Sequence, residues 1–456
     1  MISLTCREIA NAVDGTLFPG DREATVCGIS IDSRTVKDKD LFVPLKGENA
    51  DGHRFIEGAF KNGAAASFCE YPYKKEYDNG IVIVVDDTLA ALQKAAAYYR
   101  SKFDVQIAAV TGSSGKTTTK DLLATVLRPH FSVLKTEGNF NNHIGLPLTL
   151  FNLEPEHDVA VLEMAMRGPG EIGLLTKIAR PQWAVLTNIG DAHIERLGSV
   201  ENIAAAKGEL LAEMDKSGNA ILNGDDPFLR RLGSEYDGKV YYYGFGKDAD
   251  FNAGEYSLSK EGSSFKLSFP DGNKVKYSLP IPGKHNVSNA LAALALGYLM
   301  GIEPENMDFF SWSSDASAGR LQTQTSSQGA LIIDDTYNAN PVSMKASLQI
   351  LADMKIKGRK FAVLGDMLEL GDFSRDKHRE IGEKVGEAGL DLLITVGAQA
   401  AYIGEEAGKR GLETEICANN KEAWSILGKI ALTPHDAVFL KGSRGMKLEE
   451  LVEKLK

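Results

Sequence analysis

Apolar and polar residues alternate in blocks along most of the chain, and the blocks have the lengths of strands and helices. From residue 104 to about residue 315, compact apolar runs are separated by longer stretches with helical periodicity. Strands that alternate with helices predict a mainly parallel sheet with crossover helices, and ligands of such sheets lie beyond the carboxyl ends of the strands. The runs are VQIAAVTG, DVAVLEMAM, WAVLTNIG and NAILNGDD.

The regions on either side of this central stretch have patterns of their own. Residues 1–103 mix short strand-like runs with helix-like stretches, and residues 316–456 predict a further α/β unit. Between 239 and 280, apolar and polar residues alternate one by one, which predicts a small antiparallel insertion. We therefore expect an α/β protein of three domains, 1–103, 104–315 and 316–456. The outer runs are LFVPLKG and IVIVVDD, then GALIIDDTYN, KFAVLGDM, LDLLITVG and DAVFLKGS.

The length supports this division, because 456 residues correspond to about three domains at roughly 150 residues each. The apolar share of 43% is ordinary for a globular protein. The longest helical apolar run, 290–300, is shorter than the roughly 20 residues of a membrane span. Arg7, Glu8 and Asp14 interrupt the start of the chain, where a signal peptide would be apolar. These features predict a cytoplasmic protein without a membrane span.

Cysteine spacing and net charge argue against two further classes of protein. The cysteines show no metal-type spacing, so we expect buried reduced thiols. A net charge of −11 argues against a nucleic-acid scaffold, because phosphate backbones need broad basic surfaces. An anionic small molecule would instead need locally placed lysine and arginine. The cysteines are Cys6, Cys27, Cys69 and Cys417.

A glycine turn follows the first strand of the central stretch, in AAVTGSSGKTTTKDLLATVL at 108–127. Backbone amides of such a turn and the start of the following helix favour phosphate oxygens. Lys116 adds a charge, and Thr117 adds a hydroxyl for Mg²⁺. The usual phosphate loop has four residues between its first glycine and Gly-Lys-Thr, whereas only two separate Gly112 from Gly115 here. The alternative is an ordinary strand-to-helix turn that contains Gly-Lys-Thr by accident.

The shortened loop TGSSGKTT resembles the phosphate loop of the Mur ligase superfamily, which has the form TGxxGKT. Stretches similar to other motifs of the family follow in the family's order and cover nearly the whole chain. In the central domain they are KTEGNFNNHIGLPLTL, LEMAMRGPGEI, LTNIGDAHIERLGSVENIAAAKGEL, NGDDP and PGKHNVSNALAALALG. In the third domain they are GRLQ, IIDDTYNANPVSMKASL, VLGDMLELG and LKGSRGMKLEEL.

The resemblance implies three domains: a small N-terminal UDP-binding domain, a central phosphate-loop domain and a C-terminal Rossmann-like domain. DDTYNANPVSM followed by GDMLELG is most similar to the branch that adds D-alanyl-D-alanine to UDP-N-acetylmuramoyl-tripeptide. It implies ATP-dependent amide formation through an acyl phosphate, and we expect a monomer. Two alternatives stay open: another amide ligase, either of the Mur type or similar to folylpolyglutamate synthase, and a phosphate-loop NTPase that hydrolyses ATP without making an amide.

The resemblance also implies the residues that bind nucleotide phosphates and two Mg²⁺ ions. Glu163 ends an apolar strand, where its carboxylate would face the loop; otherwise it is a solvated or helix-capping glutamate. Taken alone, a histidine such as His193 more often has a structural role. Lys207, taken alone, would be a solvent-facing lysine on a helix. The family uses these positions, with Thr117, as metal ligands, and several members carry a carbamylated lysine at the Lys207 motif. The loop residues are Gly112, Ser113, Ser114, Gly115, Lys116, Thr117 and Thr118.

Other nucleotide contacts are implied on both sides of the second domain boundary. Asn286 and Asn289 would approach adenine from one face of a helix, although Asn286 is also a reasonable helix cap. Arg320 and Asp335 would reach over ATP from the third domain. This division requires the domains to close, with hinges expected near 101–106 and 312–320.

Substrate contacts are expected in all three domains. In the first domain, DSRTVKDKDLFVPLKGENADGH resembles the UDP-binding region, although it also reads as an exposed polar loop. The UDP contacts implied there are Ser33, Arg34, Lys46 and Gly47. Asn142 in the central domain is a further substrate candidate. The dipeptide candidates are Asn338, Asn340, Lys441, Ser443 and Arg444.

Overall fold

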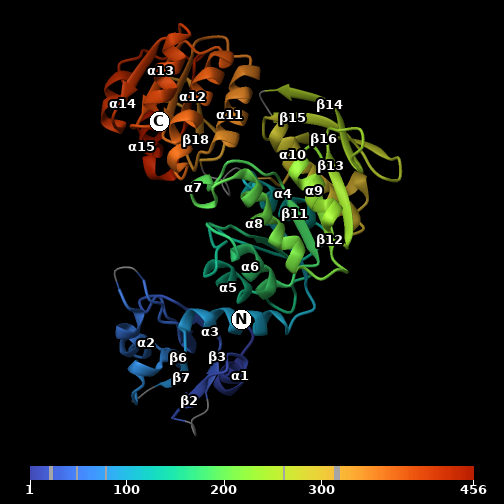
Figure 1. The fold of residues 1–456 in the computed structure, drawn as a ribbon, viewed down its shortest axis with the longest axis vertical. Helices are drawn as coiled ribbons and strands as arrows, with labels where there is room; N and C mark the ends of the chain where they lie inside the picture. Colours follow the sequence, from blue (N-terminus) through green and yellow to red (C-terminus); the bar gives the residue numbers. More distant parts are fainter. Residues whose placement is uncertain (20–23, 48–49, 78–79, 260–261, 313–318) are drawn as a thin grey trace.

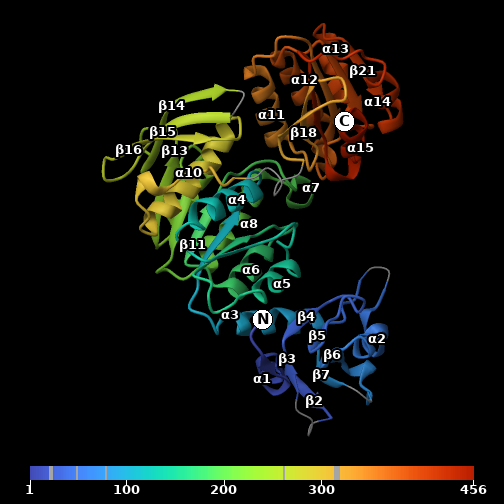
Figure 2. The same ribbon diagram turned by 180° about the vertical axis from the view of Figure 1, so that it is seen from behind.

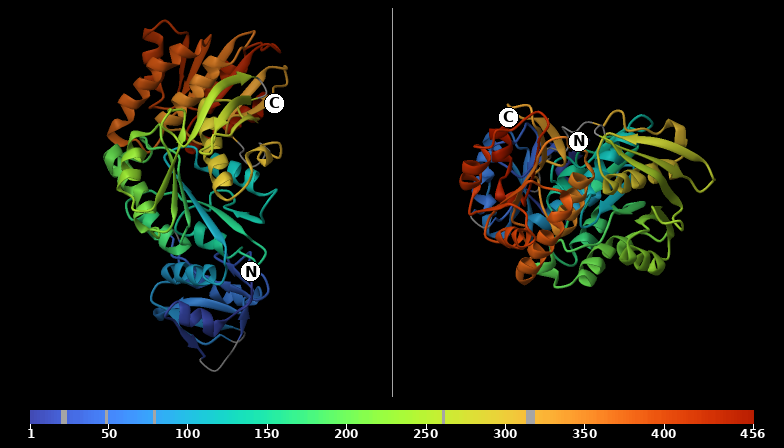
Figure 3. Two further views of the ribbon diagram at one scale, coloured as in Figure 1. Left: turned by 90° about the vertical axis from the view of Figure 1, so that its right-hand side faces the viewer. Right: turned by 90° about the horizontal axis from the view of Figure 1, so that it is seen from above.

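The structure is a computed structural model that describes residues 1–19, 24–47, 50–77, 80–259, 262–312 and 319–456. Three bodies follow one another along the long axis of the molecule (Figure 1), and the view from behind shows the same arrangement (Figure 2). The N-terminal body lies at one end, the C-terminal body at the other, and the central sheet between them (Figure 3). Each body is built on a sheet of its own, and the sheets are mostly parallel, which confirms the predicted fold class.

The N-terminal domain contains a five-stranded sheet in the order β2-β7-β6-β5-β4, parallel except for β2. The apolar run IVIVV forms β7, of which all but one residue are buried. The sheet strands are β2 (Thr16–Phe18), β4 (Gly28–Ser30), β5 (Asp40–Phe42), β6 (Ala66–Glu70) and β7 (Ile81–Val85). A separate pair is formed by β1 (Leu4–Thr5) and β3 (Thr25–Val26). The helices are α1 (Cys6–Ala12), α2 (Ile56–Lys61) and α3 (Thr88–Arg100).

The central domain contains a nine-stranded sheet in the order β16-β15-β14-β13-β12-β11-β8-β10-β9. Pairing is parallel from β9 to β14, and β15 and β16 then add antiparallel strands. The predicted antiparallel insertion therefore exists, but it extends the main sheet, and β13 within it is parallel to β12. The strands are β8 (Gln106–Thr111), β9 (Val133–Lys135), β10 (Val159–Glu163), β11 (Trp183–Leu186), β12 (Asn219–Asn223), β13 (Lys239–Gly244), β14 (Phe251–Ser259), β15 (Gly262–Ser268) and β16 (Lys274–Leu279).

Helices of the central domain follow its strands, as the parallel pairing requires. The alanine- and leucine-rich α10 is buried along most of its length because it packs against α4 and the sheet. The helices are α4 (Lys116–Leu127), α5 (Gly145–Leu150), α6 (Glu171–Ala179), α7 (Ile194–Leu197), α8 (Val200–Glu213), α9 (Pro227–Glu235) and α10 (Lys284–Leu299).

The C-terminal domain contains a six-stranded sheet in the order β17-β18-β22-β19-β20-β21, parallel except for β17. The four predicted strands form its centre, and two polar edge strands, β17 and β21, escaped prediction. The strands are β17 (Gln322–Thr325), β18 (Leu331–Asp335), β19 (Lys360–Gly365), β20 (Leu392–Val396), β21 (Thr414–Cys417) and β22 (Ala437–Lys441). The helices are α11 (Pro341–Asp353), α12 (Ser374–Val385), α13 (Ala401–Lys409), α14 (Asn420–Leu427) and α15 (Glu449–Leu455).

Helix α3 joins the N-terminal domain to the central domain. The Tyr99 hydroxyl accepts a hydrogen bond from the Ile2 amide and donates one to the Leu153 carbonyl, each at 2.8 Å. The buried Arg100 guanidinium donates to the carbonyls of Ala179, Phe103 and Val105. These bonds tie the predicted first hinge, 101–106, to the central domain, whereas residues 313–318 of the second predicted hinge lie outside the described residues.

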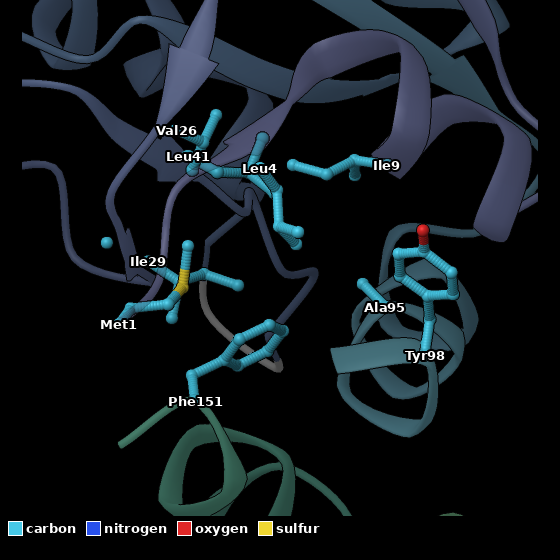
Figure 4. A pocket seen from close by; sticks show the side chains of 10 residues that line it. Met1, Leu4, Ile9, Val26, Ile29, Leu41, Ala95, Tyr98 and Phe151 are labelled. Carbon is cyan, nitrogen blue, oxygen red and sulfur yellow. The ribbon is translucent and has the colours of Figure 1, made fainter. Parts of the chain in front are cut away.

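A small apolar cavity of about 10 Å³ lies at this junction between the N-terminal and central domains, which we call the seam. It is enclosed by α3, strand β1 and Phe151 of the central domain (Figure 4). It has room for about one water, but a buried water needs two or more polar partners. Met1, Leu4 and Ile29 supply further apolar walls. The cavity is therefore a packing gap of the seam.

Two further features of the described residues concern membrane spans and cysteines. Among the described helices, none combines the length and apolarity that crossing a bilayer requires. The four cysteines are free, and Cys6, Cys69 and Cys417 are buried as expected. Cys27 is exposed, so the prediction of a buried thiol is wrong there.

Candidate functional site

A cavity of about 1170 Å³ lies between the central and C-terminal domains, beyond the carboxyl ends of β8, β10 and β11. Most residues singled out from the sequence line it. From the central domain they are Ser113, Ser114, Gly115, Lys116, Thr117, Thr118, Asn142, Glu163, His193, Asn286 and Asn289. From the C-terminal domain they are Arg320, Asp335, Asn338, Asn340, Lys441, Ser443 and Arg444.

The glycine turn between β8 and α4 is packed directly against the segment that follows β11. A Cβ atom at Gly112, whose φ is +150°, would lie 1.9 Å from the Thr187 hydroxyl oxygen. The amides of Ser113 and Ser114 both donate to Asn188, one to its carbonyl and one to its side chain, each at 2.9 Å. These two amides are therefore engaged within the protein.

The start of α4 offers further amides toward the cavity. Gly115, with φ +78°, stands at the N-cap position, and no side chain caps the helix. An uncapped helix start leaves its first backbone N–H groups for water or a ligand, and the helix dipole favours an anion there. Lys116, Thr117 and Thr118 occupy this first turn, so the amides placed to accept an anion belong to the helix more than to the loop.

Lys116 lies back over the loop that precedes it. Its amino group donates to the Gly112 carbonyl at 2.8 Å. Burial lowers the pKa of Lys116, and the nearby Glu163 carboxylate opposes that shift. A cation is thus held beside the amides where a phosphate would lie.

Glu163 is the last residue of β10 and lies beside Val110 of β8. Its side chain is buried, and its Oε1 accepts a hydrogen bond from the Asn141 amide at 2.8 Å. Within the part of the chain that the structure describes, the buried Oε2 has no hydrogen-bond partner. A buried carboxylate oxygen without a donor is costly unless a cation compensates it. The burial also contradicts the alternative of a solvated glutamate.

Lys207 on α8 is buried, with 1% of its surface exposed, so it does not face solvent. Its pKa lies well below the ordinary value because burial desolvates the amine and the Lys116 charge repels a second positive charge. No hydrogen bond or ion pair to a described residue engages its amino group. Lys207 is therefore a buried amine near Lys116 whose lowered pKa favours the neutral form.

His193 precedes α7 in a left-handed backbone conformation, with φ +66°. Its Nδ1 lies 2.6 Å from Oε2 of Glu369, which belongs to the C-terminal domain. The hydrogen bond with His193 lowers the pKa of the Glu369 carboxyl. Sequence reasoning missed Glu369 as a site residue, although it lies in the stretch GDMLELG that carried part of the resemblance.

Asn286 and Asn289 lie on the buried face of α10 that meets the glycine turn. A Cβ atom at Gly115 would lie 2.5 Å from the Asn289 side-chain oxygen. The side-chain amide of Asn286 donates to the Pro282 carbonyl at 2.8 Å. Gly283 is the N-cap of α10 and no side chain caps the helix, so the capping alternative for Asn286 is wrong.

The C-terminal domain contributes a buried ion pair and two arginine side chains. Lys441 pairs with Asp335, which also accepts a hydrogen bond from the Ser347 hydroxyl at 2.7 Å. Their charges neutralise each other, so both serve first to brace β18 against β22. The guanidinium groups of Arg320 and Arg444 lie 4.0 and 5.9 Å from the centre of the Tyr337 ring.

Several predicted substrate side chains are already hydrogen-bonded within the protein. Ser443 accepts from the Leu368 amide at 2.9 Å and donates to the Ala339 carbonyl. Asn340 caps α11 and donates to the Ser113 carbonyl across the domain boundary at 3.4 Å. Asn142 accepts from the amides at the start of α5. Asn338 uses its carbonyl to accept from Lys441.

The four residues expected to bind UDP do not line this cavity. They lie in the N-terminal domain, which sits at the opposite end of the molecule from the C-terminal domain (Figure 1). Arg34 forms a two-pronged ion pair with Asp32, and Lys46 pairs with Glu70. The Gly47 amide donates to the Ala50 carbonyl, and the Ser33 carbonyl accepts from Asn62.

Three sequence models of one protein family match consecutive parts of the chain. Residues 25–100 match "Mur ligase family, catalytic domain", residues 110–297 match "Mur ligase middle domain", and residues 319–444 match "Mur ligase, glutamate ligase domain". The chain belongs to the Mur ligase family.

Individual members of the Mur ligase family match over nearly their full lengths. The UDP-N-acetylmuramoyl-tripeptide–D-alanyl-D-alanine ligase of Bacillus subtilis is 41% identical, covering 100% of this chain and 99% of its own. A crystal structure of MurF from Acinetobacter baumannii is 32% identical with a TM-score of 0.91, covering 100% and 99%. MurF of Thermotoga maritima, solved in complex with ADP, is 31% identical with a TM-score of 0.81, covering 94% and 96%.

We predict that Gly112→Ala weakens the binding of ADP at least about tenfold, or about 1.4 kcal/mol. The added Cβ would overlap the Thr187 hydroxyl, and φ +150° is a conformation that alanine rarely adopts. Isothermal titration calorimetry measures the affinity. Gly198→Ala is the matched control, because Gly198 also has a positive φ but open space around it. Wild-type affinity in Gly112→Ala would contradict the tight packing of the turn.

Proposed function

We propose that the chain is an ATP-dependent, ADP-forming ligase that joins D-alanyl-D-alanine to the terminal carboxylate of UDP-N-acetylmuramoyl-tripeptide, a step of peptidoglycan synthesis. The 41% identity to the Bacillus subtilis ligase over the whole chain carries the substrate assignment. The cavity between two domains, with Lys116 at an uncapped helix start and the unpartnered Glu163 oxygen at the end of β10, supports the use of a nucleotide. Such nucleotide substrates are consistent with a cytoplasmic enzyme.

The reaction has two balanced steps. A carboxylate oxygen of the tripeptide attacks the γ-phosphorus of ATP, and ADP leaves with the bridging oxygen. The amine of the dipeptide then attacks the acyl phosphate carbon, an amide bond forms, and phosphate and a proton are released. No protein nucleophile is required, so the protein acts by positioning and by stabilising charge. Lys116 and the first amides of α4 would stabilise charge on the transferred phosphoryl group.

The residues of the cavity suit Mg²⁺. Mg²⁺ binds through one or two carboxylates together with water and phosphate oxygens, and Glu163 offers a buried oxygen without a partner. Among the described residues, no group of three or more acidic, histidine or cysteine side chains is placed to hold a metal ion, and phosphate or substrate oxygens would supply further ligands. Thr117, Glu163, His193 and Lys207 would hold two ions. When bound, the ions neutralise phosphate charge and so favour attack at phosphorus.

Lys207 is proposed to act as a carbamate. A neutral amine attacks CO₂, a nitrogen–carbon bond forms, and a proton is released. Burial and repulsion from Lys116 lower the pKa of the amine, which favours the neutral form that reacts. The product exchanges a cation for an anionic oxygen donor that suits a hard metal ion.

The remaining site residues are assigned by position. Asn286 and Asn289 would approach the adenine, and Arg320 would contact ATP from the C-terminal domain. Arg444 is proposed to hold the dipeptide carboxylate, because its exposed guanidinium can reorient from Glu449, 3.3 Å away. The other candidate cation, Lys441, already pairs with Asp335. Ser33, Arg34, Lys46 and Gly47 are proposed for UDP, and Asn142, Asn338, Asn340 and Ser443 for shaping the peptide-binding region.

The proposed contacts are distributed over three domains, with boundaries proposed at 1–103, 104–315 and 316–456. No single domain holds a complete site, so turnover requires the C-terminal domain to close over the central domain. The complete set of contacts is available within one chain, which is consistent with a monomer.

The function is tested by ATP turnover with UDP-N-acetylmuramoyl-tripeptide, with and without D-alanyl-D-alanine. We expect ADP and the ligated pentapeptide to form in equal amounts only when both substrates are present. A phosphate-loop NTPase would hydrolyse ATP without them. Product from a free amino acid or a folate in place of the dipeptide would instead support another ligase.

We predict that Lys116→Ala lowers the ligation rate about a hundredfold. Losing one charge-assisted contact to a transferring phosphoryl group removes about 3 kcal/mol of transition-state stabilisation. Steady-state kinetics at saturating ATP measure the loss. Lys94→Ala, which removes an exposed lysine paired with Asp14, serves as the control. Near-normal turnover by Lys116→Ala would refute the role.

We also predict that Lys207→Ala loses activity and that short carboxylates such as formate or acetate restore part of it. The added carboxylate would supply the missing oxygen donor. Lys177→Ala is the control, since Lys177 is an exposed lysine on α6, and this variant should not respond to carboxylate. A crystal grown with bicarbonate and nucleotide that shows Lys207 as a plain ammonium would argue against the carbamate.

A further inference from the structure

Two residues with left-handed backbone conformations meet across the boundary between the central and C-terminal domains. His193 has φ +66° and Glu369 has φ +63°. Their side chains lie 2.6 Å apart, from Nδ1 to Oε2, and both residues line the large cavity. Left-handed conformations are uncommon outside glycine and tend to persist where surrounding contacts impose them, often at functional sites.

The loop that carries Glu369 is fixed within the C-terminal domain. The Met367 amide donates to Nε2 of the buried His378, and the Leu368 amide donates to the Ser443 hydroxyl, each at 2.9 Å. The preceding Asp366 carboxylate accepts the amides at the start of α13. Glu369 is therefore presented by a rigid loop, so its position follows that of the whole domain.

The segment that carries His193 is fixed on the other side by the glycine turn. Asn188 accepts the amides of Ser113 and Ser114, and the Gly190 amide donates to the Ser113 hydroxyl at 2.9 Å. A second ion pair, from Lys377 of α12 to Asp191 at 2.9 Å, joins the same segment to the C-terminal domain. Residues 188–193 thus touch the phosphate-binding turn and the C-terminal domain together.

We propose that Glu369 is a positioning residue that holds His193 in the tautomer with its proton on Nδ1. A carboxylate accepts and does not donate, so the proton between the two groups lies on Nδ1 and leaves a lone pair on Nε2 for the cavity. This inference rests on the proposed function, in which His193 faces a metal ion. Metal-binding histidines commonly donate their other ring nitrogen to a carboxylate, which fixes ring orientation and raises basicity.

Because Glu369 comes from the C-terminal domain, the histidine is oriented only while that domain is docked. The domain proposed to bind the attacking amine thereby completes the centre that activates ATP. An undocked enzyme would have a misoriented His193 and would activate the carboxylate poorly. This coupling would limit loss of the acyl phosphate to water when no amine acceptor is held nearby.

The first test reads the tautomer directly in the metal-free, full-length protein. Nitrogen-15 NMR of labelled histidine distinguishes the two neutral tautomers, and His193→Gln identifies the resonance. We expect the Nδ1–H form in wild type and in Glu369→Gln, whose amide oxygen still accepts. Glu369→Ala should shift to the Nε2–H form that is usual in water. The Nε2–H form in wild type, or an unchanged tautomer in Glu369→Ala, would overturn the proposal.

The second test separates orientation from docking by kinetics. Glu369→Ala should lower kcat about 10- to 100-fold, the usual effect of removing a partner of a metal-binding histidine. Glu369→Gln should recover most of that loss. Lys377→Ala removes the ion pair from Lys377 to Asp191 without touching His193, and its kcat should stay near wild type. Equal losses of kcat in Glu369→Ala and Lys377→Ala would show that Glu369 only docks the domain.

The two tests also separate this proposal from the proposed function. If wild-type protein fails to ligate the tripeptide and the dipeptide, the function is wrong, and the NMR comparison still decides whether Glu369 sets the tautomer. If wild type ligates but Glu369→Ala keeps full kcat, the function stands and the positioning role fails.

Discussion

The close packing of the glycine turn on the segment after β11 is the contact on which the rest of the site depends. There is no room for a side chain at Gly112, and Asn188 accepts both following amides. This contact fixes where α4 begins, and so where Lys116 and the first helical amides lie. The same segment continues to Gly190, where a Cβ would lie 2.5 Å from Val342 of the C-terminal domain. One stretch of backbone therefore links the glycine turn to the domain interface.

Charged groups buried around this contact explain why the site needs ligands. Lys207 and Glu163 are buried and Lys116 is half-buried, and burial lowers the pKa of both lysines. An uncompensated buried charge destabilises a protein, so such groups are retained where a ligand completes them. Phosphate oxygens beside Lys116 and a cation beside Glu163 would each provide the missing partner. Under the proposed function, a nucleotide bound together with its metal would supply both partners.

The two domain junctions differ in how they are held. At the N-terminal junction, Tyr99 and Arg100 bind several carbonyls of the central domain, and apolar side chains fill the seam. At the C-terminal junction, the His193–Glu369 hydrogen bond and the Lys377–Asp191 ion pair border a large cavity. Buried hydrogen bonds resist opening, whereas polar contacts that border water are more readily exchanged. Closure over substrates is therefore expected chiefly at the C-terminal junction.

Features that depend on neighbouring residues could be predicted from the sequence. Hydrophobic periodicity predicted the central strands, and local spacing placed the glycine turn before α4 and Glu163 at the end of β10. Polar edge strands such as β17 escaped prediction because their pattern lacks a buried face. Which side chains meet depends on the folded chain: Glu369 contacts His193, Lys441 contacts Asp335, and Asn188 contacts the glycine turn. These pairs come from residues far apart in the chain, and periodicity carries no information about which distant segments the fold brings together.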